Sequence, residues 1–431
     1  MALRRLSQAL RTSLLIFVLA LGIRLVWIAL SSHQMISDEL DYHRLAVSLV
    51  EDGAYAIGGM PTAYRPPGYP LILWLVYSIA GVDANAVLIL QAVLDALLAV
   101  LLFRTLLARD THAARIAGYT WAMFPTAILF SGLLLTETLF TGIVFGALLL
   151  VATRKDAPSV AASGLLLGLG CLIKPWLVVF VGLLGIYAVL QWGSRRQLLI
   201  AVVVAGLCTI PWMMRNSSAL GVFTLSTNAG MNLYVGNNPD ATGGYSGRFP
   251  EQIVSAIGNE RRLDSLSRSL ALDDIAGHPG RFVVNAVKKA ARLFGSEGEL
   301  LVYSFSSDDH GTRYSTQYRD LPLAVTILAN LPSLLLLVLG TAGLVTAEKT
   351  PERPYALLLA VALLLTTIVF FGSSRFRFPM MPYLVLYGSL VAAHPKSYLQ
   401  SLSPLKRAVA ASVVLFICAL WITEAVLLAN A

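Results

Sequence analysis

Charged residues are scarce in this sequence of 431 residues. They make up 13% of the chain, about half of the roughly 25% that is typical of soluble proteins. Hydrophobic residues account for 57%, and the mean hydropathy is +0.71. This composition excludes a soluble globular domain, and we expect a protein that crosses the membrane many times.

Metal ligands and thiols are also few. The three cysteines, Cys171, Cys208 and Cys418, all lie inside apolar runs, so we expect no disulfide framework and no thiolate metal site. No metal-ligand spacing occurs among His33, His43, His278 and His310. The sequence also lacks an internal repeat, a low-complexity tract and a glycine-rich nucleotide loop. We therefore predict neither a catalytic divalent metal nor another cofactor.

The net charge of +8 does not indicate a nucleic-acid partner. The basic residues fall in short clusters between apolar runs, as they do in cytoplasmic loops. Arginines also precede the first apolar run, Leu14 to Leu30, as in a signal sequence. No small-residue cleavage site follows this run, so we predict an uncleaved signal anchor.

A membrane-spanning helix needs about 20 largely apolar residues. This rule predicts eleven spanning helices, of which 159–173 and 378–393 are short. The expected spans are 12–31, 86–107, 113–130, 133–153, 159–173, 176–193, 197–214, 321–346, 355–372, 378–393 and 407–428. The fold class is therefore an all-α polytopic membrane protein.

Loop charge predicts the orientation. With the N-terminus inside, all six cytoplasmic segments are basic, as the positive-inside bias requires. They carry Arg4, Arg5 and Arg11; Arg104, Arg109 and Arg115; Arg154 and Lys155; Arg195 and Arg196; Lys349 and Arg353; and Lys396, Lys406 and Arg407. An odd number of spans places the C-terminus outside. We divide the chain into an N-terminal transmembrane region 1–214, an external region 215–320 and C-terminal spans 321–431.

The first external segment covers 32–85. Ser37 is expected to cap a helix that runs to about Asp52 on the membrane surface. The prolines of Tyr64-Arg65-Pro66-Pro67-Gly68-Tyr69-Pro70 predict an extended entry to the next segment. The apolar run from Leu71 to Ala80 is too short to span, so we expect a second surface helix there or one that re-enters the membrane.

The second external segment is longer and mostly helical. Residues 228–239 are rich in turn formers and β-capable residues, which predicts an ordered loop with a short strand. Residues 251–276 are compatible with a helix. A basic amphipathic helix is expected to restart at Pro279 and to lie against anionic headgroups.

Ionisable residues collect at or near the predicted outer face. They are Asp38, Glu39, Asp41, His43, Arg65, Glu137, Lys174, Arg215, Arg375 and Arg377. Ions in or near hydrocarbon usually face a cavity and pair with one another or with a ligand. Carboxylates beside cations therefore suggest a base next to a site for an anionic, membrane-borne substrate.

Each of these residues also has a structural interpretation. Acids at 38, 39 and 41 suit any helix N-terminus. Glu137 can pair with Lys174 to hold two helices together, and Arg375 and Arg377 can be ordinary juxtamembrane residues. Arg24, within the first span, is expected either to reach outward or to line the cavity.

The chain resembles the GT-C glycosyltransferases of the protein O-mannosyltransferase-like group, to which the bacterial aminoarabinose transferases are related. The resemblance rests on Asp38-Glu39 after the first span, on Arg65-Pro66-Pro67-Gly68-Tyr69-Pro70 and on the segment around Glu137. It weakens after about Ala152 and returns at 228–239 and 374–379.

This resemblance implies an inverting glycosyltransferase. A sugar would pass from a polyprenyl-phosphate carrier to an acceptor on the periplasmic or extracellular face of the inner or plasma membrane. Asp38 is the implied base and Glu39 its neighbour. Donor-phosphate or substrate contacts are expected from Tyr64, Arg65, Glu137, Lys174, Arg215, Arg375 and Arg377.

Three other classes of function remain open. An O-antigen ligase or polymerase would share the external loop and the lipid-linked donor. A secondary transporter would need matching halves, whereas the external loops here are unequal, and a non-enzymatic receptor is the last alternative. The sugar and the acceptor, whether protein, lipid or glycan, are not specified by the sequence.

Overall fold

The computed structural model describes residues 2–429 except 32, 246–248, 306–320 and 349. The chain is built almost entirely from helices, as predicted. The helices that overlap the predicted spans are α1 (Ala2–Leu30), α4 (Ala84–Leu107), α5 (Thr111–Ala122), α7 (Glu137–Thr153), α8 (Ala157–Ile173), α9 (Leu177–Leu190), α11 (Leu198–Leu220), α18 (Leu323–Thr346), α19 (Arg353–Val369), α20 (Met381–Ala393) and α22 (Pro404–Ala429).

Further elements join these helices. They are α2 (Asp38–Glu51), β1 (Ala56–Ile57), β2 (Met60–Pro61), α3 (Gly68–Ala80), α6 (Pro125–Ser131), α10 (Trp192–Arg195), α12 (Ala229–Gly236), α13 (Glu251–Val254), α14 (Glu260–Gly277), α15 (Pro279–Phe294), α16 (Gly298–Phe305), the 3₁₀ helix η1 (Ser374–Met380) and α21 (Pro395–Ser401). Within the described residues, β1 and β2 form a two-stranded antiparallel hairpin.

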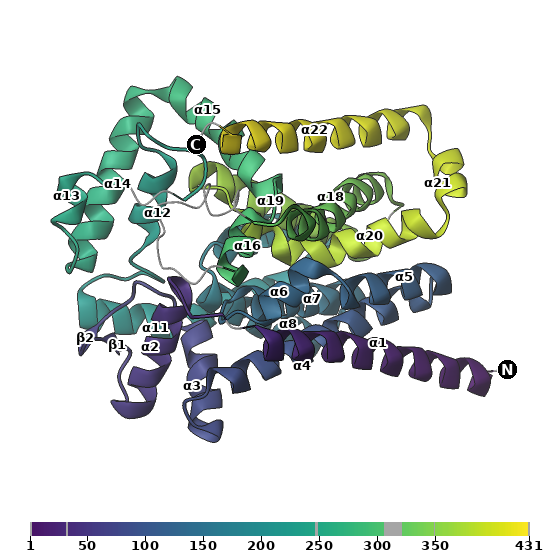
Figure 1. The fold of residues 1–431 in the computed structure, drawn as a ribbon, viewed down its shortest axis with the longest axis horizontal. Helices are drawn as coiled ribbons and strands as arrows, with labels where there is room; N and C mark the ends of the chain where they lie inside the picture. Colours follow the sequence, from purple (N-terminus) through teal and green to yellow (C-terminus); the bar gives the residue numbers. More distant parts are fainter. Residues whose placement is uncertain (1, 32, 246–248, 306–320, 349, 430–431) are drawn as a thin grey trace.

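The molecule has two distinct ends (Figure 1). One, here called the α2 end, gathers α2, α3, the hairpin and α12 to α15; the other, the α21 end, holds α21 and the start of α1. Contacts between loops define the α21 end independently. Arg109 pairs there with Glu352, and His394 Nε2 lies 2.7 Å from Asp110 Oδ2.

Among the described residues, five helices are long and apolar enough to cross a membrane. They are Ser7–Leu30 within α1, α4, α11, α18 and Pro404–Leu427 within α22. The other apolar helices are shorter, among them α7, α8, α9 and α19. The architecture is thus that of a polytopic membrane protein, and the count of eleven spans stays a prediction.

The span predicted at 113–130 is instead two helices, α5 and α6. The break falls at Phe124, whose ψ of 114° is extended. Pro125 follows, and the ring of a proline disfavours a helical conformation in the residue before it. The next predicted span, 133–153, begins only at Glu137. The non-helical turn before it is stabilised by side chains, because Leu133 O accepts from Gln91 Nε2 at 2.9 Å.

Segment 228–239 contains a helix, α12, and not the predicted strand. Its asparagines act as caps and not as turn formers: Asn238 Nδ2 donates to Tyr234 O at 2.9 Å, and Asn237 Nδ2 to Leu233 O at 2.8 Å. These bonds satisfy carbonyls at the C-terminal end of the helix that have no helical partner. Gly230 lets α12 pack closely on α14, since a Cβ there would lie 1.9 Å from Asp264 O.

Arg24 lies within α1 and neither reaches outward nor lines a cavity, contrary to both expectations. It is fully buried, and its Nε donates to Asp95 Oδ2 at 2.6 Å. The rest of the guanidinium bonds to backbone carbonyls, including Ala122 O at 2.9 Å. Trp121 Nε1 donates to the second oxygen of Asp95 at 3.0 Å. A buried ion pair is tolerated only when its remaining polar atoms are satisfied in this way, and this one joins α1, α4 and α5.

Candidate active site

The first turn of α2 presents two carboxylates on one side. Asp38 and Asp41 are three positions apart, and residues at i and i+3 are neighbours on a helix surface. Ser37 precedes them with a φ of +47°, the one positive value among the described non-glycine residues. Its side chain makes no capping hydrogen bond, so the predicted cap is wrong. Such strained backbone costs on the order of 1–3 kcal/mol and clusters at functional sites.

Arg65 binds both of these carboxylates. Its Nη2 lies 2.7 Å from Asp38 Oδ1 and 2.8 Å from Asp41 Oδ2, and its Nε donates to Asp41 at 2.9 Å. The ring of Tyr64 lies 5.2 Å from the guanidinium carbon. Tyr55 Oη donates to the carbonyl of Arg65 at 3.0 Å. The extended segment ahead of α3 is therefore anchored so that its cation points at α2.

Arg375 comes from the opposite side, at the start of η1. Its Nη2 lies 3.3 Å from Asp38 Oδ2, its Nε 2.9 Å from Glu137 Oε1, and its Nη1 3.4 Å from Glu299 Oε1. Ser373 donates to the other oxygen of Glu299 and caps η1 at the backbone N–H of Arg375. One guanidinium thus joins α2, α7, α16 and η1.

Lys174 completes the cluster from the C-terminal end of α8. Its Nζ lies 3.1 Å from Glu137 Oε1, the oxygen that also accepts from Arg375. The rings of Phe140 and Phe376 lie 5.9 Å and 5.8 Å from the ammonium group. The predicted pairing of Glu137 with Lys174 is therefore present, but as part of a larger network.

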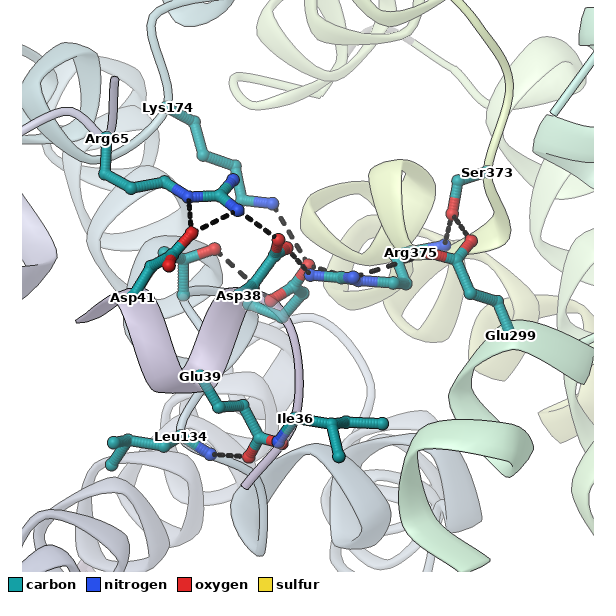
Figure 2. A network of polar contacts seen from close by, with 12 residues as sticks. Ile36, Asp38, Glu39, Asp41, Arg65, Leu134, Lys174, Glu299, Ser373 and Arg375 are labelled. Atoms are coloured by element: carbon teal, nitrogen blue, oxygen red, sulfur yellow. Dashed lines mark hydrogen bonds and ion pairs between the residues drawn. The ribbon is translucent and has the colours of Figure 1, made fainter. Parts of the chain in front are cut away.

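Together these groups form the Asp38 cluster (Figure 2). It comprises Asp38, Asp41, Arg65, Glu137, Lys174, Glu299 and Arg375. Four carboxylates and three cations give it a formal charge of −1. Asp38 is 21% exposed, whereas Glu137 is 1% exposed. Asp38 is thus the acid that holds two of the cations and remains open to a substrate.

The cations set the protonation state of Asp38. Burial raises the pKa of this carboxyl, but the charges of Arg65, Arg375 and Lys174 outweigh burial and lower its pKa to about 2. Asp38 is therefore ionised at neutral pH. Burial also raises the pKa of Tyr303, whose ring lies 5.0 Å from Arg375, so that this phenol stays protonated.

Glu39 lies on a different side of α2 and does not join the Asp38 cluster (Figure 2). It is 1% exposed, and its oxygens accept from the backbone N–H groups of Leu134 at 2.8 Å and Ile36 at 3.3 Å. Its other close contact is with His33 Nε2 at 2.6 Å. This geometry connects α2 to the turn before α7. Successive residues of an α-helix are 100° apart, so the spacing alone favours Asp41 over Glu39 as the companion of Asp38.

Two further predicted cations lie elsewhere. Arg215 donates to the carbonyls of Thr62 at 2.7 Å and Tyr55 at 2.8 Å, which holds the hairpin against α11. Arg377 pairs with Glu297 at 2.7 Å and donates to a carbonyl of α15. Neither arginine forms an ion pair with a member of the Asp38 cluster among the described residues.

Glu299 was missed by the sequence analysis. The sequence feature that could have indicated Glu299 is the position of this acid next to the apolar run of α16. That run lies within the segment predicted to be an external loop. His43 binds Tyr77 Oη at 2.9 Å and has a structural role. No group of three or more His, Cys, Asp or Glu side chains is arranged to hold a metal ion within the described part of the chain.

Residues 64–214 match the family model of dolichyl-phosphate-mannose-protein mannosyltransferase. The match includes Tyr64, Arg65, Glu137 and Lys174 but stops short of Asp38 and Arg375. No curated protein sequence matches the chain.

Two solved structures of the oligosaccharyltransferase of Archaeoglobus fulgidus share the fold. One, of AglB in complex with an inhibitory peptide and a dolichol-phosphate, has a TM-score of 0.50 at 15% identity and covers 98% of this chain and 56% of its own. The other, tethered to an acceptor peptide, has a TM-score of 0.51 at 15% identity. The alignment covers 98% of this chain and 55% of the archaeal chain. ArnT from Cupriavidus metallidurans aligns with a TM-score of 0.41 at 15% identity, covering 94% and 82%.

The chain therefore has the GT-C fold of membrane glycosyltransferases. It spans slightly more than half the length of the archaeal enzymes that it matches.

Proposed function

We propose that this GT-C fold protein is an inverting glycosyltransferase that moves a sugar from a polyprenyl-phosphate carrier to an acceptor at the α2 end. The observation that carries the proposal is the position of Asp38. This open carboxylate lies within 3.3 Å of two arginines that can also bind a phosphate. A base and a phosphate site are therefore adjacent, as the reaction requires.

Arg65, Lys174 and Arg375 are the proposed phosphate-binding groups. Arginine binds phosphate through its planar fork and lysine as a point charge. Arg65 and Lys174 are partly exposed, at 17% and 13%, whereas Arg375 is buried, at 7%. The matched family and the archaeal structure with bound dolichol-phosphate support a polyprenyl-phosphate donor. Because every cation of the cluster already contacts a carboxylate and the formal charge is −1, the donor phosphate has to displace contacts between these cations and the carboxylates.

That displacement activates Asp38. The cations lower the pKa of this carboxyl to about 2, and a general base works best when its pKa lies near the working pH. A phosphate that draws Arg65 and Arg375 toward itself removes part of their effect on Asp38, and the pKa of Asp38 then rises. Donor binding and activation of the base are thereby coupled.

The transfer is a single displacement. The acceptor hydroxyl attacks the anomeric carbon from the face opposite the phosphate, and its proton passes to Asp38. The bond between the anomeric carbon and the phosphate oxygen breaks, with its electron pair staying on the phosphate. The three cations stabilise the charge that develops there. The products are a glycoside of inverted configuration and a polyprenyl phosphate.

We place the site on the outer face of the membrane. The support is the distribution of loop charge: the basic segments containing Arg109, Arg195 and Lys396 belong to the α21 end, away from the Asp38 cluster. Positively charged loops favour the cytoplasmic side. The acceptor would then be a molecule outside the cytoplasm.

The test is incubation of the purified protein with a panel of polyprenyl-phosphate sugars, followed by mass spectrometry of the carrier. We expect one or more of these donors to be converted to the free polyprenyl phosphate when a suitable acceptor is present. Consumption of polyprenyl-diphosphate oligosaccharides alone would favour a ligase, and consumption of neither class would overturn the proposal.

A further inference from the structure

We propose that the protein binds the headgroup of an anionic phospholipid in a basic cavity at the α21 end. The cavity has a volume of about 650 Å³ and lies between the C-terminal ends of α7 and α9, the helix α10 and the start of α19. Its lining includes three cations, Lys155, Arg195 and Arg353. This site is separate from the proposed transfer site and does not depend on it.

The two sites lie at opposite ends of α7. Glu137 of the Asp38 cluster is the first residue of this helix, and Ala152, in the cavity wall, is near its last. Fifteen residues of helix cover about 22 Å at 1.5 Å per residue. A ligand in the basic cavity is therefore remote from the Asp38 cluster.

The three cations of the cavity have no acidic partner in the part of the chain that the structure describes. Within the described residues, no carboxylate lies within 4.0 Å of the charged groups of Lys155, Arg195 or Arg353. In the Asp38 cluster, by contrast, every cation already contacts a carboxylate. An anion can therefore enter the basic cavity without displacing an internal partner.

Hydrogen bonds fix two of these cations in the wall. Arg353 donates to the carbonyls of Leu344 at 3.0 Å and Val345 at 2.9 Å. Arg195 Nη1 lies 3.4 Å from the hydroxyl of Tyr355, which is fully buried. Positioned donors of this kind lose less entropy when they bind a phosphate than mobile surface chains do.

The surroundings indicate a lipid and not a soluble phosphate. Close to the cavity, α9 exposes Ile186 at 57% and Leu190 at 76%, and Trp192 follows at 55%. Tryptophan is enriched at the level of lipid headgroups, so Trp192 marks the height of the membrane interface beside Ser194 and Arg195. An occupant could place its phosphate among the cations and its acyl chains along α9.

The predicted position of the cavity at the cytoplasmic leaflet also favours an anionic lipid as the ligand. The positive-inside bias places the α21 end at the cytoplasmic leaflet, where anionic lipids give a negative surface potential. Basic pockets between transmembrane helices on that side are suited to phosphate-bearing headgroups.

The test titrates phosphatidylglycerol onto the full-length protein in detergent and measures bound lipid by native mass spectrometry. Loss of a charge-assisted contact with the headgroup weakens binding about tenfold, so the double variant Lys155→Gln/Arg195→Gln should bind about 100-fold more weakly. The matched control is Arg154→Gln/Arg196→Gln, which removes the same charge from the same two loops at residues outside the cavity lining. We expect the control to bind as the wild type does.

Two further measurements identify the class of ligand, and a single variant serves if the double variant does not fold. Phosphatidylcholine should bind weakly, and inorganic phosphate should not displace phosphatidylglycerol. Should the double variant prove unstable, Lys155→Gln alone should still weaken binding about tenfold. Equal losses in the cavity and control variants, no loss in either, or displacement by inorganic phosphate would each overturn the proposal.

Discussion

Arg375 and Asp38 are 337 positions apart in the sequence, yet Arg375 Nη2 lies 3.3 Å from Asp38 Oδ2. The same guanidinium contacts Glu137 and Glu299. This arginine therefore connects the N-terminal half of the chain to its C-terminal helices at the one carboxylate that we assign as the base. Its position makes it the residue on which donor binding should depend most.

Arg375→Lys should raise the KM for the donor about 10- to 100-fold, because a charge-assisted hydrogen bond contributes about 1.5–3 kcal/mol. A lysine keeps the charge but cannot reach Asp38, Glu137 and Glu299 at once. Steady-state kinetics with a polyprenyl-phosphate sugar measure the effect. Arg377→Lys is the matched control, since it alters the same 3₁₀ helix at a side chain that pairs with Glu297. An equal rise in KM in both variants would contradict the assignment.

Arg375 and Arg377 have different partners although they are two positions apart in the same segment. The cost of ions near a membrane predicts that Asp38, Arg65, Glu137, Lys174 and Arg375 gather in one place, and these five side chains do lie together in the Asp38 cluster. The cost of ions does not predict which of Arg375 and Arg377 contacts the cluster, because the directions of these two side chains depend on the geometry of η1. A 3₁₀ helix has three residues per turn, so residues two apart point to different sides.

Two other features, the helix α12 and the partner of Arg24, could not be predicted from the sequence for related reasons. The sequence predicts a loop at α12 because asparagine favours turns, whereas the side chains of Asn237 and Asn238 bond to the carbonyls at the end of the helix. The partner of Arg24 was missed because Asp95 lies on α4, and only packing of α1 against α4 brings the two together. Apolar runs predict where helices occur. The positions at which helices are interrupted and the partners of buried ions depend on tertiary contacts, which apolar runs do not predict.

Glu39→Gln should reduce stability and spare the chemistry. The Glu39 carboxylate accepts from two backbone N–H groups and contacts His33, and an amide replaces one acceptor oxygen with a donor. Loss of a buried acceptor costs about 1–3 kcal/mol. The melting temperature in detergent should fall, while kcat for the folded protein at low temperature stays close to that of the wild type. A normal melting temperature with a severe loss of kcat would assign Glu39 a direct role.

The pH dependence follows from the lowered pKa of Asp38. A carboxyl whose folded pKa lies below its ordinary value of 3.8 stabilises the fold above that value and loses this contribution as the pH falls toward about 2. We therefore expect kcat/KM, which reports groups of the free enzyme, to show no acidic limb from Asp38 between about pH 5 and pH 8. The kcat profile should show a limb at higher pH than kcat/KM does, because bound donor draws the cations away from Asp38. Limbs at the same pH in both profiles would contradict this coupling.

The proposed orientation can be tested by cysteine labelling. Asp240 and Lys396 are both exposed. Asp240 lies at the α2 end, and Lys396 lies in α21. In a background without Cys171, Cys208 and Cys418, a membrane-impermeant maleimide should label Asp240→Cys in intact cells. It should label Lys396→Cys only after the membrane is permeabilised. The reverse pattern would place the α2 end in the cytoplasm.

The central claim is that Asp38 is the base of a sugar transfer. Asp38→Asn should fold, because Arg65 keeps Asp41 and Arg375 keeps Glu137 and Glu299 as partners. A general base contributes about 10²–10⁴-fold to the rate, whereas Asp41→Asn, which removes the neighbouring acid that binds Arg65, should cost far less.

The most direct measurement is the rate of sugar transfer by Asp38→Asn in reconstituted liposomes, compared with the wild type and Asp41→Asn at equal amounts of folded protein. The account predicts a loss of at least about 10²-fold for Asp38→Asn, with donor still bound. Transfer by Asp38→Asn at the rate of the wild type would contradict it.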